Sequence, residues 1–392
     1  MASTADLGRQ LRAALAAELP AAVPLRHELH ARPELSWHEE PTAARVAAAL
    51  GAPDAPAVAG AGRAIRIGPA SGSAVVVRAE LDALPIHERT GAPFAAGNGR
   101  MHACGHDVHL AALAALGRAA RRVELPVALL AVLQPSEETT PSGARALIDS
   151  GIFERHQVAA FVAGHVHPAV PAGAVTAGGG AVNAANDQFE IVVSGRGGHG
   201  GHPHLTDDPV PVLAQIVTAL QQLVGRRIDP MHPAVVTVGM LQAGSAPNVV
   251  PDTARALGIL RSLAPGDRET LRSRLVQVAE HTAAAFGCTA QVTIRAGEPV
   301  LVNDVRLAAA AEAWLARAGV PVPEPPRSCG ADDFAFYGRV APSLMLFAGA
   351  DAGTGAGLHT ATFLPSDDSV GVLAEALLAG YLGAVDASPG VA

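Results

Sequence analysis

Residues 101–109 read MHACGHDVH, a stretch that gathers a cysteine, an aspartate and three histidines around one glycine. Cys104 and His106 are two residues apart, so in an extended segment their side chains point to the same side, and Gly105 lets the backbone approach what they hold. Thiolate and imidazole are ligands that zinc-like metal ions prefer. The alternative is a buried Cys–His pair near the start of a helix. Asp107 weighs against it, because an acid beside a ligand histidine commonly orients that histidine.

The composition describes a well-cored globular protein with room for two domains, because its 392 residues are 49% apolar and only 16% charged. All cationic side chains are arginine and the net charge is −8, which disfavours nucleic acid and anionic membrane as partners. Three cysteines, Cys104, Cys288 and Cys329, imply no disulfide framework and suit a reducing compartment. The N-terminal segment lacks the apolar core of a secretion signal, and no run reaches the ~18 apolar residues of a membrane span. We therefore expect a cytoplasmic protein.

Four continuous apolar runs predict buried strands, at residues 74–78, 127–133, 161–164 and 343–347. Among the helical patterns between them, residues 108–123 place Cys104 and His106 in the loop just before a helix. The N-terminal residues 5–50 are helical in pattern but contain four prolines, which predict two or three shorter helices. Apolar strands separated by helices indicate an α/β fold with a mainly parallel sheet sandwiched by helices. In such sheets the ligand site lies beyond the carboxyl ends of the strands.

The pattern changes between residues 185 and 295, where strands and helices follow one another in the order βαββαβ. This order is typical of an α+β ferredoxin-like unit. We therefore expect residues 185–295 to form an inserted domain, and residues 1–184 and 296–392 to form the catalytic, metal-binding domain. The segments Gly178-Gly179-Gly180 and Gly297-Glu298-Pro299 are candidate hinges.

Further ligand-type side chains follow the predicted strands. Glu137 and Glu138 come after the strand at residues 127–133, and adjacent side chains there can hold different roles, one binding a metal and the other facing a water. A Glu–Glu pair is more often a solvated loop, but this pair follows an apolar strand beside other ligand candidates. His165 and His359 complete a set larger than one catalytic zinc requires. Two metal ions would use the whole set, and such a pair can polarise a carbonyl and activate water at neutral pH. His167 is an alternative to His165 on spacing alone.

Six motifs then resemble a known family in order and spacing: HACGHD, QPSEE, HVHP, GRGGHGGHPH followed by DP, APNVVPD and LHTATF. The family comprises dinuclear-metal amidohydrolases such as hippurate hydrolase, N-acyl-amino-acid amidohydrolases and auxin-conjugate hydrolases, which are relatives of carboxypeptidase G and aminoacylase. The resemblance extends from about residue 26 to residue 363. It implies a zinc-peptidase-like catalytic domain and an inserted domain that acts as a lid and in dimerisation.

Residue by residue, the resemblance implies five metal ligands, a general base, an oxyanion-stabilising histidine and two residues that hold the substrate carboxylate. These are, in that order, Cys104, His106, Glu138, His165 and His359; Glu137; His199; and Asn248 with Arg261. The chain departs from the family pattern at Glu80, where an aspartate is usual, and around Asp332, where the GEDF motif is altered. His202 stands where relatives vary and is a candidate for lining the acyl pocket.

The sequence therefore predicts an enzyme that uses two divalent metal ions, of Zn, Mn, Co or Ni type, to hydrolyse the amide bond of small N-acyl amino acids. A homodimer is expected, because a ferredoxin-like unit leaves a sheet edge free and several relatives complete their sites across subunits. A dipeptidase or carboxypeptidase on the same scaffold is the alternative activity. A nucleotide-binding protein is disfavoured, because residues 178–180 lack the G-x-G-x-x-G spacing. A metal-loaded binding protein without turnover is disfavoured by the presence of Glu137.

Overall fold

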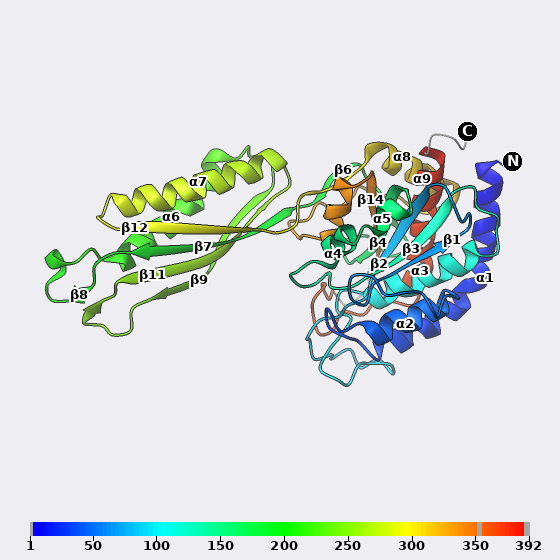
Figure 1. Cartoon of the computed structure of the whole chain (residues 1–392), viewed down its shortest axis with the longest axis horizontal. Helices are drawn as coiled ribbons and strands as arrows, with labels where there is room; N and C mark the ends of the chain where they lie inside the picture. Colours follow the sequence, from blue (N-terminus) through cyan, green and yellow to red (C-terminus); the bar gives the residue numbers. More distant parts are fainter. Residues whose placement is uncertain (1–2, 351–354, 388–392) are drawn as a thin grey trace. The chain divides into compact units, whose positions relative to one another are not determined.

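The computed structural model describes residues 3–350 and 355–387 and divides into two compact units (Figure 1). The first unit contains the chain up to Gly180, the segment Val302–Pro326 and the chain from Asp333 onward. The second contains Ala181–Leu301 together with Arg327–Asp332. Two short strands, β6 (Gly180–Asn183) and β13 (Leu301–Asn303), occupy two of the four places where the chain passes from one unit to the other.

A six-stranded sheet forms the centre of the first unit, in the order β1-β3-β2-β4-β14-β5. Its inner strands run parallel, and they are β3 (Ala128–Gln134), β2 (Ala74–Glu80), β4 (Val158–His167) and β14 (Ser343–Gly349). The edge strands β1 (Arg63–Ile67) and β5 (Val175–Thr176) run antiparallel to their neighbours. Every residue of β2, β3 and β14 is buried, as expected for apolar strands covered on both faces. The predicted fold class is confirmed.

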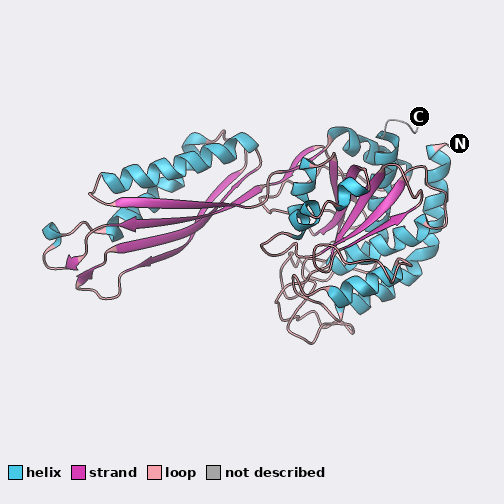
Figure 2. Cartoon of the chain, viewed as in Figure 1, coloured by secondary structure: helices cyan, strands magenta, loops and turns pink. Residues whose placement is uncertain are grey.

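Helices cover both faces of this sheet (Figure 2). On one face lie α3 (His106–Ala120) and α9 (Asp368–Ala387), with α1 (Thr4–His30) and α8 (Val305–Arg317) packed against them and α2 (Glu40–Ala49) against α3 and β1. The other face is covered by α4 (Gly143–Asp149), α5 (Ile152–Arg155) and the 3₁₀ segment η2 (Asp333–Arg339). Adjacent residues of β4 contact helices on opposite faces of the sheet: Phe161 stacks on Tyr337 of η2, and Val162 packs against Gly380 of α9.

Helix α1 is continuous over 27 residues and passes through Pro20 and Pro24. Residues 5–50 form two helices, α1 and α2, so the prediction of two or three helices is confirmed, but Pro20 and Pro24 do not interrupt α1. A proline inside a helix costs about 3 kcal/mol. The buried face of α1, which includes Leu11, Leu15 and Leu29, belongs to the core of the first unit, and burial of each such side chain contributes about 1.5–3 kcal/mol. Tertiary packing outweighs the local preference here.

Helix α9 is long and apolar enough to cross a membrane by length and composition alone. Glu375 interrupts its apolar residues, so α9 has no run of the ~18 consecutive apolar residues expected of a membrane span. Of its most apolar window, 72% is buried inside the unit. The helix packs against β4, β14, α3 and α8, which is the position of a core helix.

The second unit is a four-stranded antiparallel sheet in the order β12-β7-β11-β9. Its strands are β7 (Ala185–Ser194), β9 (Ala234–Ala243), β11 (Thr253–Ser262) and β12 (Thr289–Ala296), and its helices are α6 (Pro209–Arg227) and α7 (Pro265–Ala284). Both helices lie on one face of the sheet (Figure 2). This is the predicted βαββαβ arrangement of a ferredoxin-like unit. A small ribbon of β8 (Gly198–His199) and β10 (Val249–Val250) and the 3₁₀ turn η1 (Pro203–Leu205) extend from it.

Candidate metal centre

The ligand-type side chains of the first unit meet at the carboxyl ends of the parallel strands. His165 lies near the end of β4, the loop with Glu137 and Glu138 follows β3, and His106 opens α3 rather than preceding it. Gly105, just before the helix, has φ +87°, and a Cβ at this position would lie 2.4 Å from Cγ2 of Val166 on β4. Only glycine lets the chain turn this close to β4 and bring Cys104 next to His165.

Two groups of possible ligand atoms form around Glu138. In the first, Cys104 Sγ lies 3.2 Å from His359 Nε2, and His359 Nε2 lies 3.3 Å from Glu138 Oε1. In the second, ligand atoms of His106, Glu137 and Glu138 lie within 4.8 Å of one another. Cys104 Sγ is also 3.3 Å from His165 Nε2. The structure thus brings the five expected ligands and Glu137 together, and Glu138 is common to both groups.

His106 and His165 each direct one ring nitrogen to this centre. His106 Nδ1 donates to the backbone oxygen of Asp82 at 2.8 Å, which leaves Nε2 buried with no hydrogen-bond partner among the described residues. His165 Nδ1 donates to Val166 O at 2.7 Å, so its Nε2 faces Cys104. A hydrogen bond on one ring nitrogen fixes the other as a metal-binding lone pair. His167, the alternative to His165, instead packs edge-on against Phe347 and accepts a hydrogen bond from Ala169 N.

The electrostatic field of the centre favours cations. Burial opposes charge on His106, but Glu80 and the hydrogen bond to Asp82 raise its pKa to about 10. Burial, together with Glu138 and Glu137, raises the pKa of the Cys104 thiol well above its usual value. Burial and then His109 lower the pKa of His165 well below its usual value. The acids that hold a proton on His106 equally attract a metal ion, and such an ion would deprotonate Cys104.

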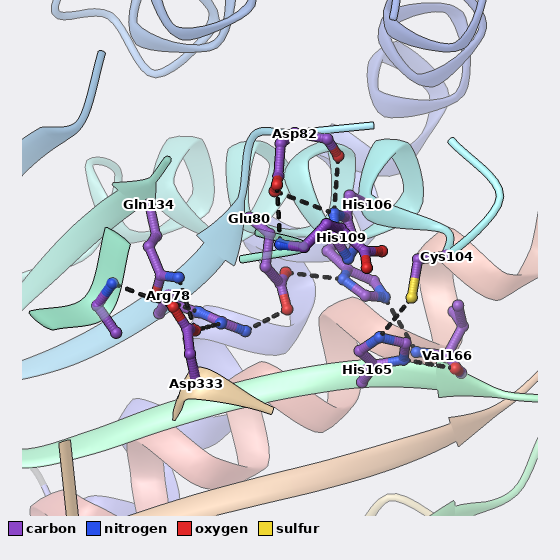
Figure 3. Close-up of polar contacts among 12 residues, drawn as sticks. Arg78, Glu80, Asp82, Cys104, His106, His109, Gln134, His165, Val166 and Asp333 are labelled. Atoms are coloured by element: carbon purple, nitrogen blue, oxygen red, sulfur yellow. Dashed lines mark hydrogen bonds and ion pairs between the residues drawn. The ribbon is translucent and has the colours of Figure 1, made fainter. Parts of the chain in front are cut away.

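A second layer of buried polar residues supports the ligands, and of these residues only Glu80 was singled out from the sequence (Figure 3). His109 donates from Nδ1 to Glu80 at 2.8 Å and accepts at Nε2 from Val166 N at 3.0 Å, so both nitrogens are used. Glu80 also pairs with Arg78. Asp82 Oδ2 accepts from Glu138 N at 3.0 Å while its backbone holds His106. These partners are far apart in sequence, so only the α3–β2–β4 packing reveals them.

Asp107 does not orient His106, contrary to the expectation from their adjacency. Its carboxylate instead accepts hydrogen bonds from Arg26 Nε at 3.1 Å and His30 Nδ1 at 3.0 Å, both on α1. Successive residues at a helix start point in different directions. Asp107 therefore fastens α3 to α1, and the orienting role belongs to Asp82.

His359 adopts a left-handed backbone conformation, with φ +63°. Its amide donates to Ala103 O at 2.9 Å, which holds this loop against the Cys104 segment. A non-glycine residue in this region costs about 1–3 kcal/mol and is typical of functional sites.

The remaining predicted site residues, His199, Asn248 and Arg261, belong to the second unit. His199 on β8 pairs with Val249 on β10, and Gly200 N donates to Asn248 O at 2.8 Å, so His199 and Asn248 are neighbours in an exposed ribbon. Arg261 lies at the opposite end of β11 and donates to Cys329 O at 2.8 Å. Strand β11 separates the two positions by about 25 Å at 3.3 Å per residue. Asn248 and Arg261 of one chain therefore cannot hold one carboxylate together.

Comparison with known proteins identifies the family. Residues 76–379 match the model of peptidase family M20/M25/M40. The chain belongs to this family. N-acetylcysteine deacetylase of Bacillus subtilis is 35% identical over 83% of the chain and 87% of its own length. N-acetyldiaminopimelate deacetylase of Shouchella clausii is 34% identical over 78% of the chain and 81% of its own length. The crystal structure of a dinuclear metal-binding M20 peptidase from Bacillus subtilis has a TM-score of 0.82 and 29% identity, and covers 93% of this chain and 98% of its own.

The chain is thus a hydrolase of a metal-dependent family, and its cluster fits two metal ions. The fit rests on Nε2 of His106, which is buried and bonded to none of the residues that the structure describes, and on a donor set of thiol, imidazole and carboxylate groups that meet around Glu138. Such sets suit zinc and similar transition metals.

Metal binding should release protons, because His106 and Cys104 both carry a proton at pH 7 without a cation. We expect about two protons per fully loaded chain at pH 7 and an apparent affinity that rises with pH, since fewer protons must then be displaced. Titration of metal-free protein with ZnCl₂ in weak buffer measures the release. Cys104→Ala should release about one proton fewer, and an unchanged pH on metal addition would contradict the expectation.

Proposed function

We propose that this enzyme hydrolyses the amide bond of N-acyl amino acids in the cytoplasm. The observation that carries the proposal is the contact of the buried Cys104 and His165 with the exposed His359, beside the Glu137–Glu138 pair, which matches the chemistry of amide hydrolysis by activated water. The similarity to deacetylases of N-acetylcysteine and N-acetyldiaminopimelate supports this substrate class. The free thiols Cys104, Cys288 and Cys329 fit a reducing compartment.

In this proposal the residues of the chain divide the work. Cys104, His106, Glu138, His165 and His359 hold two metal ions. When bound, the metal pair polarises the acyl carbonyl and lowers the pKa of a water molecule. Glu137 removes a proton from that water as it attacks the acyl carbon, and later gives the proton to the leaving amine. His199 donates a hydrogen bond to the developing oxyanion.

Substrate recognition would come from the second unit. An α-carboxylate suits the planar guanidinium of Arg261, which makes two parallel hydrogen bonds with such a group. His199 and Asn248 lie at the other end of β11, in an exposed ribbon. We propose that the protein is a homodimer in which His199 and Asn248 complete the partner's site. Their position in an exposed ribbon, away from the ligands of the first unit in sequence, supports this role.

The first test is a hydrolysis screen. Protein reloaded with Zn, Mn, Co or Ni should cleave acetyl- or benzoyl-amino acids faster than dipeptides. Glu137→Gln, which keeps the size but not the base, should lower turnover by about 10²-fold or more with metal content unchanged. Glu138→Gln is the matched control, and it should lose metal as well as activity. Near-normal turnover of metal-loaded Glu137→Gln would refute the mechanism, and faster dipeptide cleavage would favour the dipeptidase alternative.

The second test concerns the shared site. His199→Ala and Glu137→Gln are each expected to be inactive, but an equal mixture should regain about one quarter of wild-type activity, because half of the dimers are mixed and each holds one intact site. Pull-down of an untagged variant by a tagged one establishes that subunits have exchanged. If exchange occurs and activity stays absent, His199 acts within its own chain or not at all.

A further inference from the structure

The loop that carries Glu137 and Glu138 is closed on one buried carboxylate, that of Asp333 in η2. At the start of the loop, Gln134 Nε2 donates to Asp333 Oδ1 at 2.8 Å. At its end, Ser142 Oγ and Ala144 N donate to Asp333 Oδ2 at 2.7 Å and 3.1 Å. A single side chain therefore binds both ends of the loop, and it is 1% exposed.

The loop itself is tightly folded between these anchors. Gly143 N donates to Ser136 O at 2.9 Å, and a Cβ on Gly143 would lie 1.7 Å from Pro135 O, so the two ends of the loop touch. Ser136 has φ +46°, in the left-handed region. Such a conformation persists only where the surroundings enforce it. Ser136 N donates to Glu39 Oε1 at 2.8 Å, and the hydrogen bonds to Asp333 hold the loop at both ends.

The charge of Asp333 is balanced by the buried Arg78, whose Nη2 donates to Asp333 Oδ1 at 2.9 Å (Figure 3). Arg78 Nε donates to Gln134 Oε1 at 2.9 Å, so it also steadies the start of the loop. The same guanidinium pairs with Glu80. Glu80 accepts a hydrogen bond from His109, which in turn accepts one from Val166 N, next to His165 on β4. Arg78 thus joins the support of the Glu137 loop to the support of the ligand strand β4.

We propose that Asp333 is a positioning residue that sets the place of the Glu137 carboxylate at the metal centre. The hydrogen bonds from Gln134, Ser142 and Ala144 to Asp333, here called the clasp, close the loop of residues 134–144. Loss of these acceptor oxygens lets the loop move while the sheet stays intact. A misplacement of about 1 Å at a catalytic group can cost about 10²-fold in rate. The role in turnover rests on the proposed function, whereas the closure of the loop does not.

The test compares variants that open the clasp with variants that preserve it. Asp333→Asn replaces one of the two carboxylate oxygens by an NH2 group, which cannot accept a hydrogen bond. Either Ser142 and Ala144 or Arg78 and Gln134 therefore lose their acceptor. Ser142→Ala removes one donor, and Ser142→Thr restores the hydroxyl. Tyr337→Phe is the control, because it removes a buried donor to Gln134 Oε1, at 2.8 Å, while Arg78 Nε still donates to that oxygen and Gln134 Nε2 still donates to Asp333.

Hydrogen exchange of the peptide spanning residues 135–143, measured on metal-free protein, reports loop closure directly. Exchange should be about tenfold faster in Asp333→Asn and Ser142→Ala, and unchanged in Ser142→Thr and Tyr337→Phe. With saturating metal, kcat of the first two should fall by about tenfold or more while KM changes less than about threefold.

Wild-type exchange and wild-type kcat in folded Asp333→Asn would overturn the proposal. If Asp333→Asn does not fold, equal exchange and kcat in Ser142→Ala and Ser142→Thr would overturn it instead. Faster loop exchange in a protein that cleaves no N-acyl amino acid supports the clasp and refutes only the proposed substrate class.

Discussion

Burial of several acids and imidazoles at one edge of a parallel sheet is the constraint on which the functional part of this protein depends. Isolated charges are expensive to bury, so they persist only when paired or bound to a metal. Here Glu80, Asp82, Glu138 and Cys104 surround histidine nitrogens, and one of these, His106 Nε2, is buried and has no hydrogen-bond partner in the described part of the chain. Two divalent cations balance this arrangement. Burial and the surrounding carboxylates raise the pKa of Cys104, and carboxylates also raise the pKa of His106 against the effect of burial, so without a metal ion these two side chains keep their protons.

The fold supplies this arrangement through a few close contacts. Parallel strands bring their carboxyl ends to one edge, so segments from residues 82 to 359 can meet there. Gly105 allows the start of α3 to approach β4, and His109 fastens that helix to Val166 beside His165. The left-handed His359 and the closed Glu137 loop are strained segments held by surrounding hydrogen bonds. Ligand geometry therefore depends on the rigidity of β2, β4 and α3.

Much of the fold could be predicted from the sequence because its strongest patterns are local. Continuous apolar runs such as residues 74–78 identify buried strands, and the βαββαβ order identifies the inserted unit. Pro20 and Pro24 suggested breaks in the first helix, but α1 is continuous because its packing against α3 and α9 stabilises it. The ligand residues could be proposed because their types are unusual and follow strands. Their supports could not, since Asp333 and Ser142 or His109 and Val166 are joined only by tertiary structure. The separation of Asn248 from Arg261 likewise required the register of β11.

The central claim is that these side chains hold two metal ions with Cys104 as a ligand. X-ray absorption of zinc-loaded protein, combined with metal analysis, tests it most directly. We expect two zinc ions per chain and a sulfur neighbour at about 2.3 Å, together with nitrogen and oxygen neighbours at about 2.0–2.2 Å. The sulfur signal should disappear in Cys104→Ser. Zinc surrounded only by nitrogen and oxygen in the wild-type protein, or a content of one ion or fewer per chain, would contradict the account.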